Sequence, residues 1–471
     1  MKTIDKMYVN GEFVTPHGTE LFNLVNPVNN QLIGQVVLGD EQDVNVAVAA
    51  AKEAYKTFSQ TTKEQRIAYL KQLHDAVAKR QNELIDTMVL EYGGTYQFCK
   101  NSVNNMLSAF TTGIETLTVF EFERTVGNSK VLMQPLGVVG LITPWNSSNS
   151  FICNKLATAI SAGSTAVIKP SEMSAMQTQL LLECFHEAGL PKGLFNVVNG
   201  LGTIVGNAIT THPDIAKISF TGSTAVGKSI ARGAVDTLKR VTLELGGKSP
   251  NILLDDANLE TAIPMAVAAA YMNSGQACIA GTRLLVPESK LEEINTLVKL
   301  AVEKVKVGNP ADEDTAVGPM VSRKQYERVQ SYIKLGLEEG AELLIGGIGQ
   351  PEGLEAGNFV KPTVFTNVKN SMRIAREEIF GPVLSIIAYK DEEDAIAIAN
   401  DTDYGLQAYI SSADGQRARR VASRIIAGRV MINALTHDPQ APFGGFKQSG
   451  IGREFGVYGL EEYVEAKTLL V

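Results

Sequence analysis

The chain has 471 residues, of which 44% are hydrophobic and 20% charged, a composition typical of globular proteins with two or three domains. Its net charge of −8 disfavours binding to nucleic acids and to anionic membranes. No apolar run is long enough to span a bilayer, and the first residues, MKTIDKMYVNGEF, lack the apolar core of a signal peptide. The four cysteines show no CxxC pairing and the five histidines no HxxxH pair, so we expect a cytoplasmic protein with reduced thiols and no metal site.

Helical and strand patterns then alternate along the chain. Amphipathic helices are predicted over residues 41–85. Between 136 and 254, helical patterns separate the apolar runs LGVVGLIT, TAVIKP, LFNVVNG, IAKISF, RVTLEL and NILLDD. This alternation favours a doubly wound parallel sheet with ligands at the carboxyl ends of its strands. The pattern restarts after residue 258 and continues to about 435, which predicts a second α/β domain.

Two further segments are predicted to be strands outside these sheets. Residues 117–134 have the pattern of a β-ribbon, and the chain ends in the apolar run EAKTLLV. Because exposed apolar strands usually find a partner, we expect an oligomer interface there. The predicted fold class is therefore α/β, with two doubly wound open-sheet domains and a small β element for oligomerisation.

One motif favours a phosphate-binding loop. FTGSTAVGKSI (220–230) contains G-x-x-x-x-G-K-[ST], with Gly222, Gly227, Lys228 and Ser229 at the specified places, between a predicted strand and a helix. The run NILLDD offers Asp255 as a partner for Mg²⁺. A nucleotide hydrolase is therefore one hypothesis.

Three residues that could take part in catalysis follow predicted strands or helices of the same region. Cys278 lies among small residues in NSGQACIAGTR, where a nearby helix terminus can lower the pKa of its thiol. Glu244 ends the run RVTLEL, and Asn146 follows another strand in ITPWNSS. Taken singly, the cysteine is more often a core residue and the asparagine a helix cap. Together they are the nucleophile, base and amide donor that acyl chemistry at a carbonyl requires.

Seven motifs in order identify a family resemblance. They are PWN (144–146), IKPSE (168–172), FTGSTAVG (220–227), LELGGKSP (243–250), GQACIAG (275–281), EEIFGPV (377–383) and PFGGFKQSGIGRE (442–454). The sequence resembles the NAD(P)-dependent aldehyde dehydrogenase superfamily of the hydrolytic type. The resemblance implies an NAD-binding domain over 1–116 and 136–247, a catalytic domain over 248–447, and an oligomerisation element over 117–135 and 448–471. It also implies that 220–227 opens a helix beside a dinucleotide pyrophosphate. Lys228 and Ser229 are then coincidental, and Asp255 holds no metal.

The resemblance implies a mechanism and its residues. Cys278 attacks the aldehyde, Asn146 holds the oxyanion, hydride passes to the nicotinamide, and Glu244 activates water to release the acid. Lys155 and Glu454 match a proton network behind Glu244. The positions that match cofactor contacts are Trp145, Lys169, Glu172, Gly202, Gly222, Ser223, Gly227, Leu245, Glu378 and Phe380. Because the Glu172 carboxylate would repel a 2′-phosphate, NAD is expected over NADP.

The sequence departs from many relatives around the substrate. Ser147, Asn154 and His437 stand where aromatic or apolar residues are common, whereas Phe151 and Phe443 remain. We therefore expect short or polar aldehydes as substrates of a homodimer or homotetramer.

Two alternatives to this function stay open. One is a CoA-acylating enzyme, against which the presence of Glu244 argues; the other is a non-catalytic structural or binding descendant of the fold. Among the remaining cysteines, Cys153 lies close enough in sequence to the active-site helix to be a candidate for oxidation.

Overall fold

The first of two large sheets organises the amino-terminal half of the chain. The structure, a computed structural model, describes residues 2–470. Across the sheet the strands are β20 (Gly450–Ile451), β12 (Arg240–Glu244), β11 (Ile215–Thr221), β8 (Val138–Ile142), β9 (Thr165–Lys169), β10 (Phe195–Val197), β2 (Met7–Val9) and β3 (Glu12–Val14). The five strands from β12 to β10 are parallel. Strands β8 and β9 are buried along their whole length, as expected of parallel strands covered on both faces.

Eight helices of the described chain belong to this first domain. They are α1 (Glu41–Phe58), α2 (Lys63–Lys79), α3 (Gln81–Tyr92), α4 (Tyr96–Val119), α5 (Ser148–Ala162), α6 (Ala175–Ala188), α7 (Asn207–Thr211) and α8 (Thr224–Ala234). The sequence predicted two helices over 41–85, whereas the structure has α1, α2 and the start of α3, because Arg80 leaves the helical conformation at φ −119°. Helix α4 was not predicted, and its last residues occupy 117–119, so the β-ribbon begins later than expected.

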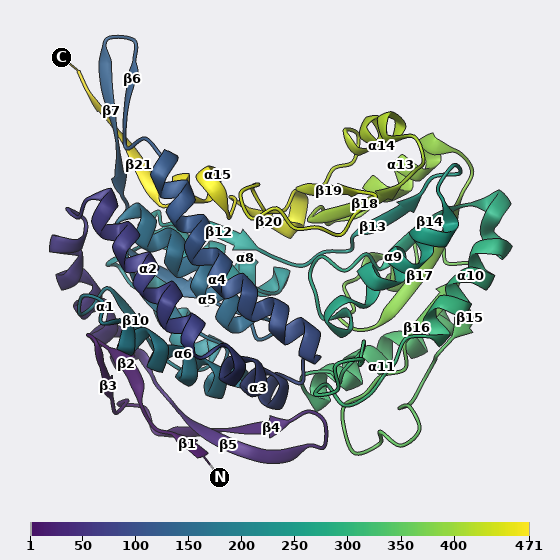
Figure 1. Cartoon of the computed structure of the whole chain (residues 1–471), viewed down its shortest axis with the longest axis horizontal. Coiled ribbons are helices and arrows are strands. Elements are labelled where there is room, and N and C mark those ends of the chain that lie inside the picture. Colours follow the sequence, from purple (N-terminus) through teal and green to yellow (C-terminus); the bar gives the residue numbers. More distant parts are fainter. Residues whose placement is uncertain (1, 471) are drawn as a thin grey trace.

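The second domain is built on a seven-stranded sheet, which lies beside the first domain in Figure 1. Its strands, in order, are β15 (Glu342–Ile345), β16 (Thr363–Thr366), β17 (Val383–Tyr389), β14 (Arg283–Pro287), β13 (Pro250–Leu253), β18 (Gln407–Ser411) and β19 (Arg429–Ile432). All pairs except β15–β16 are parallel. The helices are α9 (Leu259–Tyr271), α10 (Leu291–Glu303), α11 (Arg323–Glu338), α12 (Arg373–Arg376), α13 (Glu392–Asn400) and α14 (Gly415–Ala422). The predicted α/β fold class with two open sheets is confirmed.

Two small sheets complete the molecule. Strands β6 (Glu123–Val126), β7 (Ser129–Pro135) and β21 (Val464–Leu469) form an antiparallel ribbon that projects from one corner in Figure 1, preceded by α15 (Gly456–Glu461). The other, β1 (Lys2–Ile4), β5 (Gln31–Leu38) and β4 (Glu20–Asn26), was not predicted. Within residues 2–470, no helix combines the length and apolarity needed to cross a membrane.

The predicted domain boundaries stay a proposal. The boundary at 247/248 falls between β12 and β13, which belong to different sheets. The carboxyl-terminal segment 448–471 contributes to two sheets, because β20 pairs with β12 and β21 pairs with β7.

Candidate active site

Two adjoining cavities lie at the carboxyl ends of the first domain's parallel strands. The larger, of about 540 Å³, is lined by Asn146, Cys278 and Glu378 among others. The smaller, of about 310 Å³, is lined by Lys169 and Gly202. Both are bordered by Pro144, Trp145, Thr221, Gly222 and Ser223. The position at strand ends is the one expected for a ligand in a doubly wound fold.

Cys278 is carried into the larger cavity by a strained turn. Helix α9 ends at Tyr271, and Asn273 and Ser274 then adopt φ 50° and 57°. Gly275 follows at φ 72°, where a Cβ atom would lie 2.2 Å from the backbone of Gly381, so only glycine fits.

The Cys278 thiol is half-buried, and its surroundings set its pKa. Burial, and then the charges of Glu378 and Glu244, raise the pKa of Cys278 to about 12. The expectation that a helix terminus lowers this pKa is therefore wrong. The turn over 272–275 separates the thiol from α9, and burial near two carboxylates disfavours the thiolate.

Asn146 is tied to the segment that carries the cysteine. Its side-chain Nδ2 donates a hydrogen bond to the backbone carbonyl of Gln276 at 3.0 Å. Asn273 Nδ2 donates to the same carbonyl at 3.0 Å and to the backbone oxygen of Asn146 at 3.3 Å. The amide donor is thus fixed next to the Cys278 segment, and Asn273 is a positioning residue that the sequence did not reveal.

Glu244 lies at the end of β12 with only 2% of its surface exposed. Neither carboxylate oxygen has a hydrogen-bond partner among residues 2–470. Burial, and then the charge of Glu454, raise its pKa well above the usual value. Behind it, Lys155 forms an ion pair with Glu454 and donates to Ser219 Oγ at 2.9 Å. The structure thus places Lys155 and Glu454 together near Glu244.

The predicted cofactor residues surround the two cavities. Trp145 and Phe380 meet edge to face, with ring centroids 5.4 Å apart. Glu378 Oε1 accepts a hydrogen bond from the backbone N–H of Gly247 at 3.0 Å, and burial raises its pKa to about 7. Ser223 caps the amino terminus of α8, its Oγ accepting from the backbone N–H of Val226.

The remaining cofactor positions divide into ligand-facing and packing residues. Lys169 lines the smaller cavity, and its Nζ donates to Glu172 Oε2 at 3.0 Å. Gly227 is buried, and a Cβ atom there would lie 2.4 Å from the Leu245 side chain. Its smallness therefore serves the close packing of α8 on Leu245, which itself lines the larger cavity.

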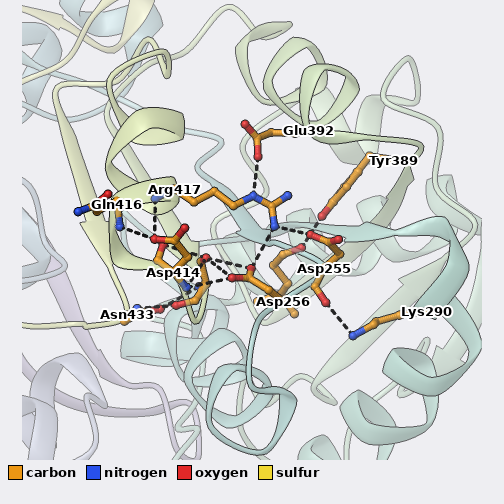
Figure 2. Close-up of polar contacts among 11 residues, drawn as sticks. Asp255, Asp256, Lys290, Tyr389, Glu392, Asp414, Gln416, Arg417 and Asn433 are labelled. Atoms are coloured by element: carbon orange, nitrogen blue, oxygen red, sulfur yellow. Dashed lines mark hydrogen bonds and ion pairs between the residues drawn. The ribbon is translucent and has the colours of Figure 1, made fainter.

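The nucleotide-hydrolase hypothesis finds no support in the geometry. Lys228 Nζ donates to Gln448 Oε1 at 2.8 Å on the surface. Asp255 belongs to the second domain, where it pairs with Arg417 at 2.5 Å beside Asp256, as Figure 2 shows. In the described chain no three His, Cys, Asp or Glu side chains are grouped to hold a metal ion. Asp255 therefore does not belong to the same site as the loop at 220–230.

A third cavity, of about 230 Å³, contains part of the predicted substrate set. Phe151, Asn154 and His437 line it. Ser147 is directed elsewhere, with its Oγ 2.7 Å from Ser102 Oγ on α4. Phe443 is buried beneath the guanidinium of Arg429, at 4.9 Å from its ring centroid.

Most of the residues that line the third cavity were not predicted from the sequence. The additional lining residues are Asn105, Ser108, Ala109, Thr112, Ser150, Pro439 and Phe455. The first four recur at spacings of three and four on α4, so an amphipathic reading of that helix was the available signal.

Cys153 is fully buried, and burial raises the pKa of its thiol well above the usual value. Reactivity follows the exposed thiolate, so the suggested oxidation of Cys153 is not supported.

The protein is a two-domain α/β protein with a projecting β-ribbon, and residues of both domains line the larger cavity. The model of the aldehyde dehydrogenase family matches residues 13–469, so the chain belongs to that family, as the motifs predicted.

Similar proteins support this membership. The 3-succinoylsemialdehyde-pyridine dehydrogenase of a Pseudomonas species is 44% identical over 472 residues, covering 100% of this chain and 99% of the relative. A mutant of aldehyde dehydrogenase C from Pseudomonas syringae, complexed with NAD+ and octanal, superimposes with a TM-score of 0.97 at 44% identity, covering 99% of this chain and 96% of the other. Aldehyde dehydrogenase from Mycobacterium tuberculosis, complexed with NAD+, gives 0.96 at 39% identity, covering 100% and 98%.

Proposed function

We propose that this enzyme oxidises an aldehyde to the carboxylic acid with NAD+ and water, using Cys278 as the nucleophile. The observation that carries the proposal is the meeting of three groups from distant segments. Cys278 and the Asn146 amide line one cavity, and Glu244 is close enough for its charge to raise the pKa of Cys278. A thiol, an amide donor and a base are the groups needed for acyl transfer through a thioester.

The residues of the two adjoining cavities fit a dinucleotide. Ser223 caps the eleven-residue helix α8, whose first residues Thr224 and Ala225 line the larger cavity, so a helix amino terminus adjoins the site as a pyrophosphate requires. At Gly246 a Cβ atom would come within 2.6 Å of Glu378 Oε2, so only glycine leaves this carboxylate its present position in the larger cavity. Trp145 and Phe380 would flank the cofactor, and Lys169 and Glu172 would hold its adenosine ribose. When bound, NAD+ supplies the hydride acceptor.

The chain's own residues would act as follows. The Cys278 thiol gives its proton to water, the thiolate attacks the carbonyl carbon, and the carbonyl π electrons move to oxygen. Asn146 then exchanges its bond to the Gln276 carbonyl for one to that oxyanion; one such donor is typically worth about 3 kcal/mol. After oxidation the acyl group is held as a thioester on Cys278.

Hydrolysis follows at the same carbon. Glu244 takes a proton from water, the hydroxide adds to the acyl carbon, and the C–S bond breaks to release the acid and the Cys278 thiolate. The ion pair of Lys155 and Glu454 lies behind Glu244. The Glu454 carboxylate would accept the proton from Glu244. The Glu244 oxygens suit this role, because no hydrogen bond from residues 2–470 competes for them.

The test is NADH absorbance on mixing the protein with aldehydes and NAD+, with and without CoA. Oxidation in the absence of CoA is expected, since Glu244 is present. Absence of NADH formation with every aldehyde would overturn the proposal, and strict dependence on CoA would favour the acylating alternative.

We propose a short or polar aldehyde as the substrate. The 230 Å³ cavity presents Asn105, Ser108, Asn154 and His437, and an apolar ligand that left such groups unpaired would cost about 1–3 kcal/mol for each. We expect kcat/KM for glycolaldehyde or lactaldehyde to exceed that for hexanal or benzaldehyde. A tenfold advantage for hexanal, equivalent to about 1.4 kcal/mol, would contradict this preference.

We further propose a cytoplasmic homodimer or homotetramer assembled through the ribbon of β6, β7 and β21. The outward strand β21 has five consecutive exposed residues, from Glu465 to Leu469. Deleting residues 465–471 should shift the mass measured by light scattering to that of the monomer or dimer.

A further inference from the structure

Arg429 is a half-buried cation behind His437, which lines the third cavity. It begins β19, and its side chain donates only to neutral groups. Nε and Nη2 donate to Gln407 Oε1 at 3.0 and 2.9 Å, and Nη1 donates to His437 Nδ1 at 2.7 Å. Among residues 2–470 no carboxylate lies within 4.0 Å of its nitrogens, and the adjacent Asp438 acts on it only from a distance. Partial desolvation lowers the pKa of Arg429, and no carboxylate of the described chain pairs with the guanidinium to offset it.

Arg283, which is fully buried, differs from Arg429 in its partners. Arg283 donates to the backbone carbonyls of Lys248, Ile398 and Ala399, and it fastens neighbouring segments of the second domain. Arg429 binds no backbone carbonyl in the described chain; both its acceptors are side chains. Holding backbone segments together therefore accounts for the contacts of Arg283 but not for those of Arg429.

The position of Arg429 connects its charge to the cavity. Its guanidinium lies 4.9 Å from the Phe443 ring centroid, and Phe443 contacts Phe455, which lines the cavity. Gln407, which accepts from Arg429, also donates a hydrogen bond to the Tyr409 hydroxyl. That hydroxyl donates to the carbonyl of Ile279 at 2.8 Å, next to Cys278. The cation thus lies on one side of the cavity while remaining near the reactive thiol.

His437 transmits this charge to the cavity. Because arginine can only donate, His437 Nδ1 must accept, which leaves the imidazole proton on Nε2. Desolvation and the charge of Arg429 lower the pKa of His437 to about 4, so the ring is neutral at physiological pH. The cavity wall therefore presents an N–H donor polarised by a cation behind it.

We propose that Arg429, together with His437, selects aldehydes that carry a carboxylate at the end remote from the aldehyde group. This inference rests on the proposed oxidation of aldehydes and names the substrate class of that same site. A carboxylate in the 230 Å³ cavity accepts from His437 Nε2 and supplies the negative charge that Arg429 lacks. The neutral polar residues Asn105, Ser108 and Thr112 remain to bind the other oxygen.

The test compares 4-oxobutanoate with its methyl ester, two substrates that differ in charge at the remote end. The wild-type protein should show kcat/KM at least tenfold higher for the acid. In Arg429→Met and in His437→Phe this ratio should fall at least tenfold, mainly through a higher KM for the acid. Arg429→Lys, which keeps the charge, should retain part of the ratio.

Arg240→Met is the matched control, because Arg240 is exposed and pairs with Glu465, and neither residue lines the cavity. It should keep the wild-type ratio. Oxidation of butanal by the wild-type protein tests the proposed function separately, so failure of that reaction and failure of the charge preference are distinguishable. A wild-type acid-to-ester ratio near one, or a ratio unchanged in both Arg429→Met and His437→Phe, would overturn the inference.

Discussion

Replacing Glu244 by glutamine isolates the hydrolytic step. The two side chains have the same shape, and the carboxylate oxygens have no hydrogen-bond partner in the described chain, so the substitution breaks no bond. A missing general base typically lowers the rate by 10²–10⁴-fold, or about 2.7–5.5 kcal/mol of barrier. We therefore expect Glu244→Gln to fold normally and to lose steady-state turnover by that amount.

Rapid mixing with NAD+ and an aldehyde provides the assay. Glu244→Gln should produce a burst of about one NADH per active site and then a slow steady rate, with the acyl-enzyme on Cys278 visible by intact-mass spectrometry. A burst at the wild-type rate assigns Glu244 to hydrolysis alone, whereas a slowed burst assigns it also to deprotonation of the thiol. Wild-type steady-state turnover in Glu244→Gln would refute the reasoning.

The pH dependence gives a second measurement on the same pair of proteins. Because burial raises the pKa of Glu244, the basic form increases with pH through a range above the usual 4.5, and wild-type deacylation should rise accordingly. The same raised pKa makes the folding stability of the wild-type protein fall as pH rises. The contribution of a carboxyl with a raised folded pKa is fully present below 4.5 and is lost as pH rises through the folded value. Glu244→Gln should therefore gain stability relative to wild type as pH increases, in urea titrations.

Three further predictions concern the thiol, the decoy motif and the cofactor. Cys278→Ala should abolish NADH formation while NAD+ binding by calorimetry survives; Cys153→Ala should remain active, and the reverse pattern would exclude Cys278 as the nucleophile. Lys228→Ala should change the free energy of unfolding by less than about 0.5 kcal/mol and leave activity intact, since Lys228 has only a surface bond to Gln448; ATP hydrolysis lost in this variant would contradict the assignment. Glu172→Gln should raise kcat/KM with NADP+ relative to NAD+, because it removes a negative charge from the ribose site; an unchanged ratio would argue against this contact.

The sequence by itself determined the fold class and the principal site residues. The alternation of apolar runs with helical patterns requires parallel strands, and parallel strands deliver their carboxyl ends to one edge. Asn146 and Glu244 each end a run, so their common position follows from local pattern alone. Seven motifs in order along the chain identified the family, and with it the positions of Lys155 and Glu454 in a network behind Glu244. Each of these signals is carried by residue types at short spacings, which the sequence displays without any tertiary contact.

Only the tertiary structure decided the environment of those residues. The pKa of Cys278 is raised rather than lowered, because burial and the charges of two carboxylates depend on how distant segments pack around the thiol. Ser147 turns toward α4 instead of the third cavity, a direction that its neighbours in sequence do not fix.

The wall of the third cavity shows the same limit. It combines α4 with a loop more than 300 residues away, and no local periodicity records that contact. The bond between Arg429 and His437 likewise depends on the path of the loop that follows β19. Burial and charge pairing are sums over the whole fold, whereas sequence patterns report one element at a time.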